Sequence, residues 1–191
     1  MNKAILYMDS LSIGHKKPIV SGINTNLNVG DFCVLLGANG TGKSTLLNTI
    51  RGTVPPQKGH VLLNDKMVTF IQEKELAKII SVVSTYTHFA SELTAYDIIS
   101  FGRTPYLGIF SKFSEKDKHT IAKYISKLEI NSLVDKKFNK LSDGQRQRVM
   151  ICRALVQDTP LILLDEPTAH LDVENRVKIF ELLKQICSEE G

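Results

Sequence analysis

The pattern of apolar and polar positions predicts that the first third of the chain is built mainly from strands. Turn-like segments rich in Gly, Asn, Asp and Pro separate the short β-compatible runs, which are Ile5–Leu11, Ile23–Asn28 and Phe32–Leu36. After a glycine-rich stretch, the residues Ser44–Arg51 predict a helix, which Gly52 ends. A further strand is expected at His60–Leu63.

The middle of the chain has a different pattern, which is typical of helices. Ser114 followed by Asp117 resembles an N-capping arrangement. The apolar residues that follow lie at the spacing i, i+3, i+4 and i+7, and they are Ile121, Tyr124, Ile125 and Leu128. This spacing places one apolar stripe along a helix. We therefore expect a mainly helical insertion from about residue 86 to residue 140.

The last third of the chain alternates between helix and strand. Ser142 and Gln145 are expected to open a helix that runs to about Gln157. The continuous apolar run Leu161–Leu164 is typical of a strand buried on both faces, and Asp172 is expected to cap a final helix. Strands that alternate with helices predict an α/β fold with a largely parallel sheet, interrupted by the helical insertion.

Composition supports a single folded domain. The chain has 191 residues, of which 42% are hydrophobic and 23% charged, so nothing predicts disorder. Its apolar stretches are far shorter than the roughly 20 residues of a membrane-spanning helix. The N-terminus lacks the pattern of a secretory signal, so residence in the cytoplasm is expected.

Charge and cysteine content argue against a nucleic-acid-binding protein and against a disulfide-rich or metal-binding one. The net charge of +4 is mild, and the basic residues are scattered or lie in short groups. A solvated face explains them better than a groove for nucleic acid. Cys33, Cys152 and Cys187 are widely spaced in apolar surroundings, which predicts buried free thiols and neither a disulfide framework nor a metal site.

A glycine-rich run carries the first sign of chemistry. Residues 37–44 fit the pattern G-x-x-x-x-G-K-[ST] between an apolar strand and a helix start, which predicts a phosphate-binding P-loop. Lys43 would reach the β- and γ-phosphates of ATP, and Ser44 would offer its hydroxyl to Mg²⁺. The expected nucleotide-binding residues are Gly37, Ala38, Asn39, Gly40, Thr41, Gly42, Lys43, Ser44 and Thr45.

Two carboxylates follow the apolar strand at its carboxyl end, where parallel α/β sheets present ligand-binding groups. Asp165 is expected to hold Mg²⁺ through water. Glu166 is placed to polarise the attacking water as a general base. Together with the P-loop, this pair predicts hydrolysis of ATP.

The segment Leu141-Ser142-Asp143-Gly144-Gln145 resembles the signature motif L-S-G-G-Q of ABC ATPases, and Asp165-Glu166-Pro167-Thr168 follows about twenty residues later. The resemblance implies a P-loop NTPase (RecA-like) core with an N-terminal antiparallel β subdomain and an inserted α-helical subdomain. The core would comprise residues 1–85 and 141–191, and the insertion residues 86–140. In this family two subunits pack head to tail as a homodimer, so Ser142, Gly144 and Gln145 would contact ATP held by a partner chain.

The segments Leu93–Asp97 and Phe101–Tyr106 resemble those of subunits that power import of ferric siderophores, haem or cobalamin. This resemblance implies transmembrane permease subunits as partners, a substrate-binding protein as an indirect partner, and no nucleic acid. It also implies a place at the cytoplasmic face of the inner membrane. Two alternatives stay open: a soluble ABC ATPase that is not linked to transport, and a degenerate ATP-binding regulatory subunit.

Three positions depart from the family pattern. Thr85 stands where the family has a Gln that contacts Mg²⁺ and the attacking water. Asp143 replaces a glycine of the signature, so weaker ATP-dependent dimerisation is expected. The residue that stacks on adenine is usually aromatic, and here either His15 or Ile13 must serve.

The family also has a final strand and a switch histidine beyond the helix at the end of this chain. His170 is no substitute, because it lies in the segment that matches the D-loop of the family. We therefore expect the sequence to be truncated. We expect the 191-residue chain to bind MgATP and to hydrolyse it poorly.

Overall fold

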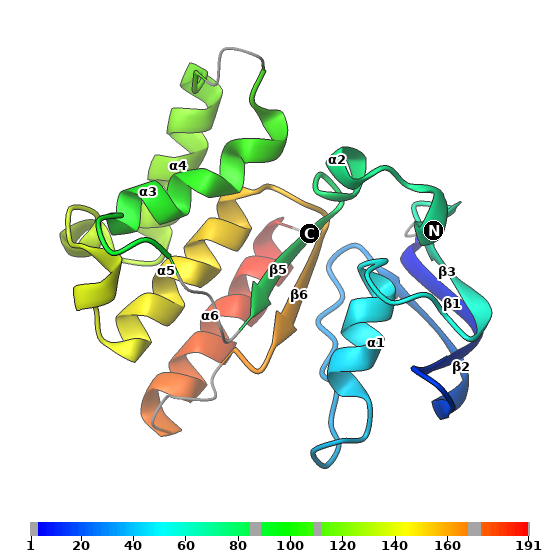
Figure 1. Cartoon of the computed structure of the whole chain (residues 1–191). Coiled ribbons are helices and arrows are strands. Elements are labelled where there is room, and N and C mark those ends of the chain that lie inside the picture. Colours follow the sequence, from blue (N-terminus) through cyan, green and yellow to red (C-terminus); the bar gives the residue numbers. More distant parts are fainter. Residues whose placement is uncertain (1–3, 85–88, 109–111, 168–172, 191) are drawn as a thin grey trace. The chain divides into compact units, whose positions relative to one another are not determined.

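A computed structural model describes residues 4–84, 89–108, 112–167 and 173–190. The chain falls into two compact units, of which the first comprises Met1–Ile79 with Phe180–Gly191 and the second Ile80–Ile179. These limits differ from the expected boundaries near residues 85 and 140, and the division into core and insertion stays a prediction. Figure 1 traces both units in sequence colours.

The first unit contains an antiparallel sheet. Its strands are β1 (Ala4–Gly14), β2 (Pro18–Asn28), β3 (Lys58–Leu63) and β4 (Lys66–Met67), in the order β2-β1-β3-β4. In β1, Leu6 pairs with Leu27 of β2 and with Leu63 of β3, and the side chain of Leu6 is 1% exposed. The predicted antiparallel β subdomain is confirmed, with strands longer than the apolar runs alone indicated.

Helix α1 (Lys43–Ile50) follows the glycine-rich loop, close to its predicted bounds. It buries Leu46, Thr49 and Ile50. Gly52 has a φ of +74° and donates its N–H to the carbonyl of Thr49, which is the left-handed ending that glycine favours. The rest of this stretch holds the 3₁₀ helix η1 (Val68–Phe70) and the short helix α2 (Glu73–Leu76).

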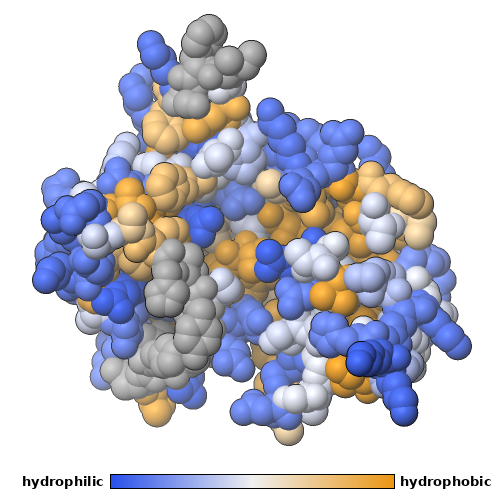
Figure 2. Space-filling view, viewed as in Figure 1, coloured by the Kyte–Doolittle hydropathy of each residue, from blue (hydrophilic) through white to orange (hydrophobic). Residues whose placement is uncertain are grey.

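The predicted strand Phe32–Leu36 is absent from the described sheets, and this prediction was wrong. The segment pairs with no described strand, and its apolar side chains are exposed, Leu36 by 90%. A strand requires a hydrogen-bonding neighbour as well as an apolar pattern, and the pattern does not supply that neighbour. Figure 2 shows that hydrophobic as well as hydrophilic residues reach the surface on the face drawn.

In the second unit, β5 (Ile80–Ser84) and β6 (Leu161–Asp165) form a parallel pair in continuous register. Ile80 lies opposite Leu161, and Ser84 lies opposite Asp165. The remaining elements are helical: α3 (Ala95–Ser100), η2 (Phe101–Tyr106), α4 (Glu115–Lys127), η3 (Asn131–Leu133), η4 (Phe138–Lys140) and α5 (Asp143–Val156). Both α3 and α4 pack against α5. The P-loop NTPase fold class is confirmed, and the described part of the predicted insertion is helical.

Helix α6 (Val173–Glu190) begins in the second unit and ends in the first. Its predicted cap, Asp172, lies outside the described residues. Within the helix, Ile179, Leu183 and Ile186 are buried at a spacing of three to four residues, which gives the helix one apolar face.

Three helices of the second unit begin with the same reciprocal cap, in which a hydroxyl and a side chain three residues later each bond to the other's backbone N–H. The pairs are Thr94 with Asp97, Ser114 with Asp117, and Ser142 with Gln145. The second and third were predicted from the sequence. The first lies in a segment that the sequence linked only to a family resemblance.

The cysteines are free, as predicted. Cys152 is buried in α5, and burial raises the pKa of its thiol to about 12, which makes it unreactive at neutral pH. The prediction of burial was wrong for Cys33, which lies exposed in the unpaired segment, and Cys187 is partly buried. No helix in the described ranges is both long and apolar enough to cross a membrane.

Candidate nucleotide-binding site

The glycine-rich loop adopts a conformation that depends on glycine at two positions. Gly40 and Gly42 have φ angles of +80° and +98°, which residues with a Cβ rarely adopt. Thr41 closes the turn by donating its hydroxyl to the carbonyl of Ala38 at 2.8 Å. The loop then leads directly into α1, whose first N–H groups and positive end suit a phosphate.

Lys43 folds back over the loop. Its ammonium donates to the carbonyls of Gly37 and Ala38, both at 2.8 Å. Carbonyl oxygens carry only partial negative charge, so a phosphate oxygen is a stronger partner for the same ammonium. The expected role of Lys43 in holding phosphate therefore requires only that its side chain exchange these two partners.

The β1–β2 hairpin packs against the glycine-rich loop. A Cβ added to Gly42 would lie 3.3 Å from Ile19 and 3.6 Å from Ile13, so the backbone of Gly42 packs directly on this hairpin. Ile13 is 1% exposed and is used for packing. His15, at the exposed hairpin turn, keeps its ring free for solvent while its carbonyl accepts a hydrogen bond from Gln57 at 2.8 Å. Of the two candidates for the adenine contact, His15 is therefore the better one.

The two acidic candidates lie at the carboxyl end of β6. Asp165 ends the strand opposite Ser84, so the ends of β5 and β6 lie side by side. Glu166 follows with a φ of +50°, a left-handed conformation that costs a residue with a Cβ about 1–2 kcal/mol. Strain of this kind is concentrated at functional sites. Thr85, the third candidate of this group, lies outside the described residues.

The oxygen atoms of Ser44 and Asp165 are of the type that Mg²⁺ prefers. Ser44 lies in the first turn of α1 in the first unit, and Asp165 is the last residue of β6 in the second unit. The donor chemistry of both residues fits the expected ion.

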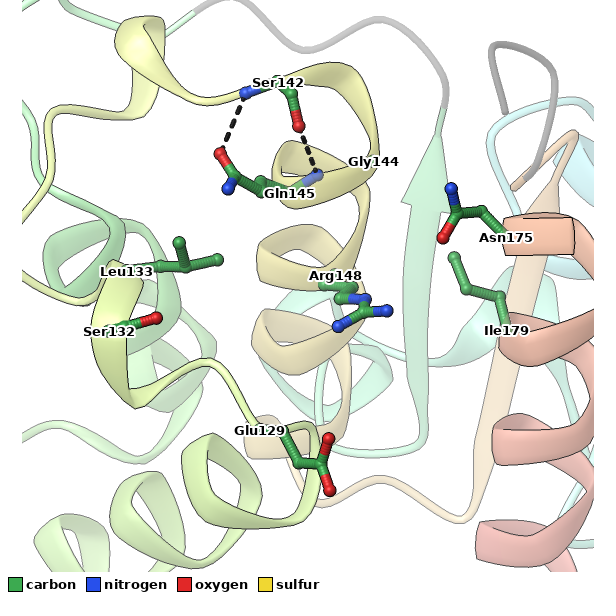
Figure 3. A pocket seen from close by; sticks show the side chains of 9 residues that line it. All are labelled: Glu129, Ser132, Leu133, Ser142, Gly144, Gln145, Arg148, Asn175 and Ile179. Atoms are coloured by element: carbon green, nitrogen blue, oxygen red, sulfur yellow. Dashed lines mark hydrogen bonds between the residues drawn. The ribbon is translucent and has the colours of Figure 1, made fainter. Parts of the chain in front are cut away.

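The signature segment forms the start of α5. The backbone N–H of Ser142 donates to Oε1 of Gln145 at 3.1 Å, and the N–H of Gln145 donates to Oγ of Ser142 at 3.3 Å (Figure 3). Both bonds are long enough to be exchanged, and Ser142, Gly144 and Gln145 are exposed or half-buried. Ser142, Gly144 and Gln145 are thus brought together at a helix N-terminus, where an anion is favoured.

A hollow of about 290 Å³ opens beside this helix start. It is lined by Glu129, Ser132, Leu133, Ser142, Gly144, Gln145, Arg148, Asn175 and Ile179. In Figure 3 the guanidinium of Arg148 projects from α5 into the hollow, toward the side on which Asn175 and Ile179 of α6 lie. Arg148 was not predicted as a site residue. The available signal was its position in the second turn of the helix that the sequence predicted from Ser142.

Asp143, the departure within the signature, has a partner that the sequence did not indicate. Its carboxylate accepts from Nη1 of Arg146 at 3.2 Å. Arg146 also donates from Nη2 to the carbonyl of Asn139 at 2.8 Å and from Nε to that of Phe138 at 3.3 Å. Part of the negative charge of Asp143 is therefore balanced within the chain, which reduces its expected effect on a neighbouring triphosphate.

A glycine-dependent phosphate loop and an acidic pair after a buried strand define a P-loop nucleotide-binding protein. The profile of the family described as "ABC transporter" matches residues 20–169 of the chain. An ABC transporter ATP-binding protein of Methanocaldococcus jannaschii is 37% identical over 188 residues, which are 98% of this chain and 65% of that protein. The chain therefore belongs to the ABC transporter ATPase family.

Two relatives carry more specific names. The ferric enterobactin transport ATP-binding protein of Escherichia coli is 32% identical over 96% of this chain, and the iron(3+)-hydroxamate import ATP-binding protein of Bacillus subtilis is 34% identical over 97%. This chain spans 68% and 70% of their respective lengths. It thus corresponds to about two thirds of its curated relatives.

Solved structures agree on the fold. CbiO1 of Clostridium perfringens, described as part of the ABC transporter complex cbiONQ, superposes with a TM-score of 0.85 at 29% identity, covering 99% of this chain and 75% of that chain. The dimeric structure of the bacterial cassette MJ0796 gives a TM-score of 0.82 at 28% identity, covering 97% of this chain and 84% of that one.

Proposed function

We propose that the protein binds MgATP and hydrolyses it to power an ABC importer. The observation that carries this proposal is the glycine-dependent P-loop, over which the ammonium of Lys43 folds, in a chain that also places Ser142, Gly144 and Gln145 at the start of α5. One segment can hold the phosphates of a nucleotide, and the other offers a helix N-terminus to a phosphate. In the proposed homodimer, each supplies half of a site.

The chemical roles follow from the side chains. Lys43, with the loop Gly37–Ser44, would bind the β- and γ-phosphates, and His15 would contact the adenine. Glu166 would orient and deprotonate the water that attacks the γ-phosphorus, while Ser44 and Asp165, assisted by Thr85, would hold Mg²⁺. When it is bound, Mg²⁺ would neutralise part of the negative charge on the phosphate oxygens.

The proposed cargo is a ferric siderophore, with haem and cobalamin as neighbouring possibilities. Support comes from the relatives named for ferric enterobactin and iron(3+)-hydroxamate, and from the segment Phe101–Tyr106. The proposed partners are transmembrane permease subunits at the cytoplasmic face of the cell membrane and, through them, a substrate-binding protein.

Hydrolysis and transport can be tested on the whole protein assembled with its permease. Glu166→Gln should lower the ATPase rate by about 10²- to 10⁴-fold, the usual contribution of a general base, and leave ATP binding intact. Uptake of a radiolabelled ferric siderophore should stop with the same variant. An unchanged ATPase rate would overturn the role of Glu166.

The rival functions give different results in the same assay. A soluble ABC ATPase would hydrolyse ATP but would not co-purify with a permease. A regulatory subunit would bind ATP with no turnover that depends on Glu166. Exchange of the siderophore for haem or cobalamin in the uptake assay decides the cargo.

A further inference from the structure

Arg103 belongs to the 3₁₀ helix η2, the segment that resembles siderophore importers and was expected to belong to the permease-docking subdomain. Its side chain is only 3% exposed, so it contributes nothing to a docking surface directly. A buried guanidinium persists only where its charge and its N–H groups are satisfied. Its partners therefore identify what it does.

The guanidinium joins two helices. Its Nε donates to Oδ1 of Asp117 at 2.7 Å, and its Nη1 donates to the carbonyl of Val156 at 2.9 Å. Asp117 is the capping carboxylate of α4, and Val156 is the last residue of α5. One side chain thus fastens the first turn of α4 to the last turn of α5.

The neighbours of Arg103 strengthen this joint. The ring of Tyr106 stacks on the guanidinium with its centroid 4.0 Å from Cζ, and its hydroxyl donates to the carbonyl of Asp158 at 3.1 Å. On the other side, a Cβ added to Gly102 would overlap the carbonyl oxygen of Arg153. The backbone of η2 therefore lies directly against the end of α5.

The opposite end of α5 carries the signature residues. With 14 residues, the helix is about 20 Å long, so a tilt of about 5° at its fixed end would displace its start by about 2 Å. A displacement of about 1 Å in a binding or catalytic group can cost roughly a hundredfold in rate. The direction of α5 is thus as important as the chemistry of Ser142 and Gln145.

We propose that Arg103 is a positioning residue, which sets the direction of α5 and so holds the signature where it can complete the site of a second chain. This inference rests on the proposed function, because it concerns ATP that the partner chain binds. A lysine cannot replace Arg103, since a single ammonium lacks the planar fork that reaches Asp117 and Val156 while stacking on Tyr106.

The test separates nucleotide binding from dimerisation. In the whole protein carrying Glu166→Gln, the affinity of the monomer for a fluorescent ATP analogue and the ATP-dependent dimer dissociation constant are measured with and without Arg103→Lys. We expect the nucleotide affinity to stay within about twofold and the dimer to weaken about tenfold, a typical size for loss of coupling. Tyr106→Phe, a milder change, should weaken the dimer by about threefold.

Ile121→Val is the matched control, because Ile121 is 1% exposed in α4 and its apolar side chain makes no hydrogen bond to Arg103. It should lower the melting temperature without weakening the dimer. The inference is overturned if Arg103→Lys has the same dimer dissociation constant as its parent. It is also overturned if Arg103→Lys and Ile121→Val lower the melting temperature equally and weaken the dimer equally. A parent protein that fails to dimerise with ATP overturns the proposed function as well.

Discussion

The P-loop and the signature segment are both proposed to hold phosphate, yet the chain builds them by opposite means. The P-loop depends on backbone conformation: Gly40 and Gly42 adopt left-handed angles that expose N–H groups along a turn. The signature depends on side chains, because Ser142 and Gln145 bond to each other's backbone. A phosphate site can therefore be specified by the absence of side chains or by their reciprocal pairing.

The comparison also shows whether local backbone geometry can distinguish a phosphate-binding site from an ordinary helix cap. The reciprocal cap of the signature recurs at Thr94 and at Ser114, neither of which is proposed to bind a nucleotide. Cap geometry alone therefore carries no function. A left-handed glycine alone carries none either, because Gly22, Gly30 and Gly52 have φ angles of +74°, +84° and +74° outside the P-loop. Four sets of substitutions test this contrast.

The largest effect is expected on the P-loop side. Lys43→Ala should reduce ATP hydrolysis by about 10²- to 10³-fold, because it removes the ammonium that is proposed to bind the β- and γ-phosphates. The melting temperature should hardly change, since both hydrogen bonds of Lys43 go to carbonyls of its own loop. Lys66→Ala on β4 is the control and should behave like the wild type in an ATPase assay. Retention of a tenth of the activity or more would contradict the role of Lys43.

A pair of glycine substitutions sharpens the contrast. Gly42→Ala should destabilise the protein by about 1–2 kcal/mol, because the residue has a φ of +98° and packs on Ile19. Gly144→Ala lies inside α5, where alanine favours the helix by up to about 1 kcal/mol. Chemical denaturation measures both. Stability changes of the same sign would mean that the two phosphate sites are not built differently.

Removal of a capping hydroxyl should have a smaller effect. Ser142→Ala and Ser114→Ala should each cost about 1 kcal/mol of stability, since each removes the same kind of cap. Only Ser142→Ala should also weaken ATP-dependent dimerisation, which analytical ultracentrifugation detects. Equal dimer affinity in the two variants would show that Ser142 acts only as a cap.

The acid in the cap of α4 is expected to make the stability of the protein depend on pH. Burial raises the pKa of Asp117, but hydrogen bonds from Ser114 and Arg103 outweigh it and hold this pKa below its usual value. The carboxylate therefore stabilises the fold above the unfolded pKa of about 3.9, and this contribution is lost as the pH falls through the lower folded value.

Unfolding measured from about pH 5 to about pH 1 should reveal that loss, and Asp117→Asn should flatten the curve. The signature cap carries the neutral residue Gln145 at the equivalent position. Gln145→Ala should therefore leave the dependence of stability on acid pH unchanged. A wild-type curve that matches Asp117→Asn throughout would contradict this assignment.

The sequence predicted much of the local structure because its signals were local. The start of α5 at Ser142, the end of α1 at Gly52 and the strand Leu161–Leu164 each depend on residues within a few positions. The same is true of the P-loop, in which glycine spacing encodes the turn itself.

What the sequence missed depends on contacts between distant positions. Phe32–Leu36 has a strand-like pattern, but pairing requires a neighbour that no local pattern supplies. The bond from Arg103 to Val156 joins residues 53 positions apart, so the segment could be linked to a family but not to its structural task. His15 became preferable to Ile13 only when the packing of the hairpin was known.

The absence of a side chain at Gly102 has an evolutionary consequence. A Cβ there would overlap the carbonyl oxygen of Arg153 and push the end of α5 away from η2. The hydrogen bonds of the neighbouring Arg103 would then be disturbed as well. We therefore expect Gly102, Arg103 and the acid at Asp117 to be kept or lost together among related chains. Such a three-residue correlation would distinguish importers in which an arginine positions the signature helix from those in which other contacts position it.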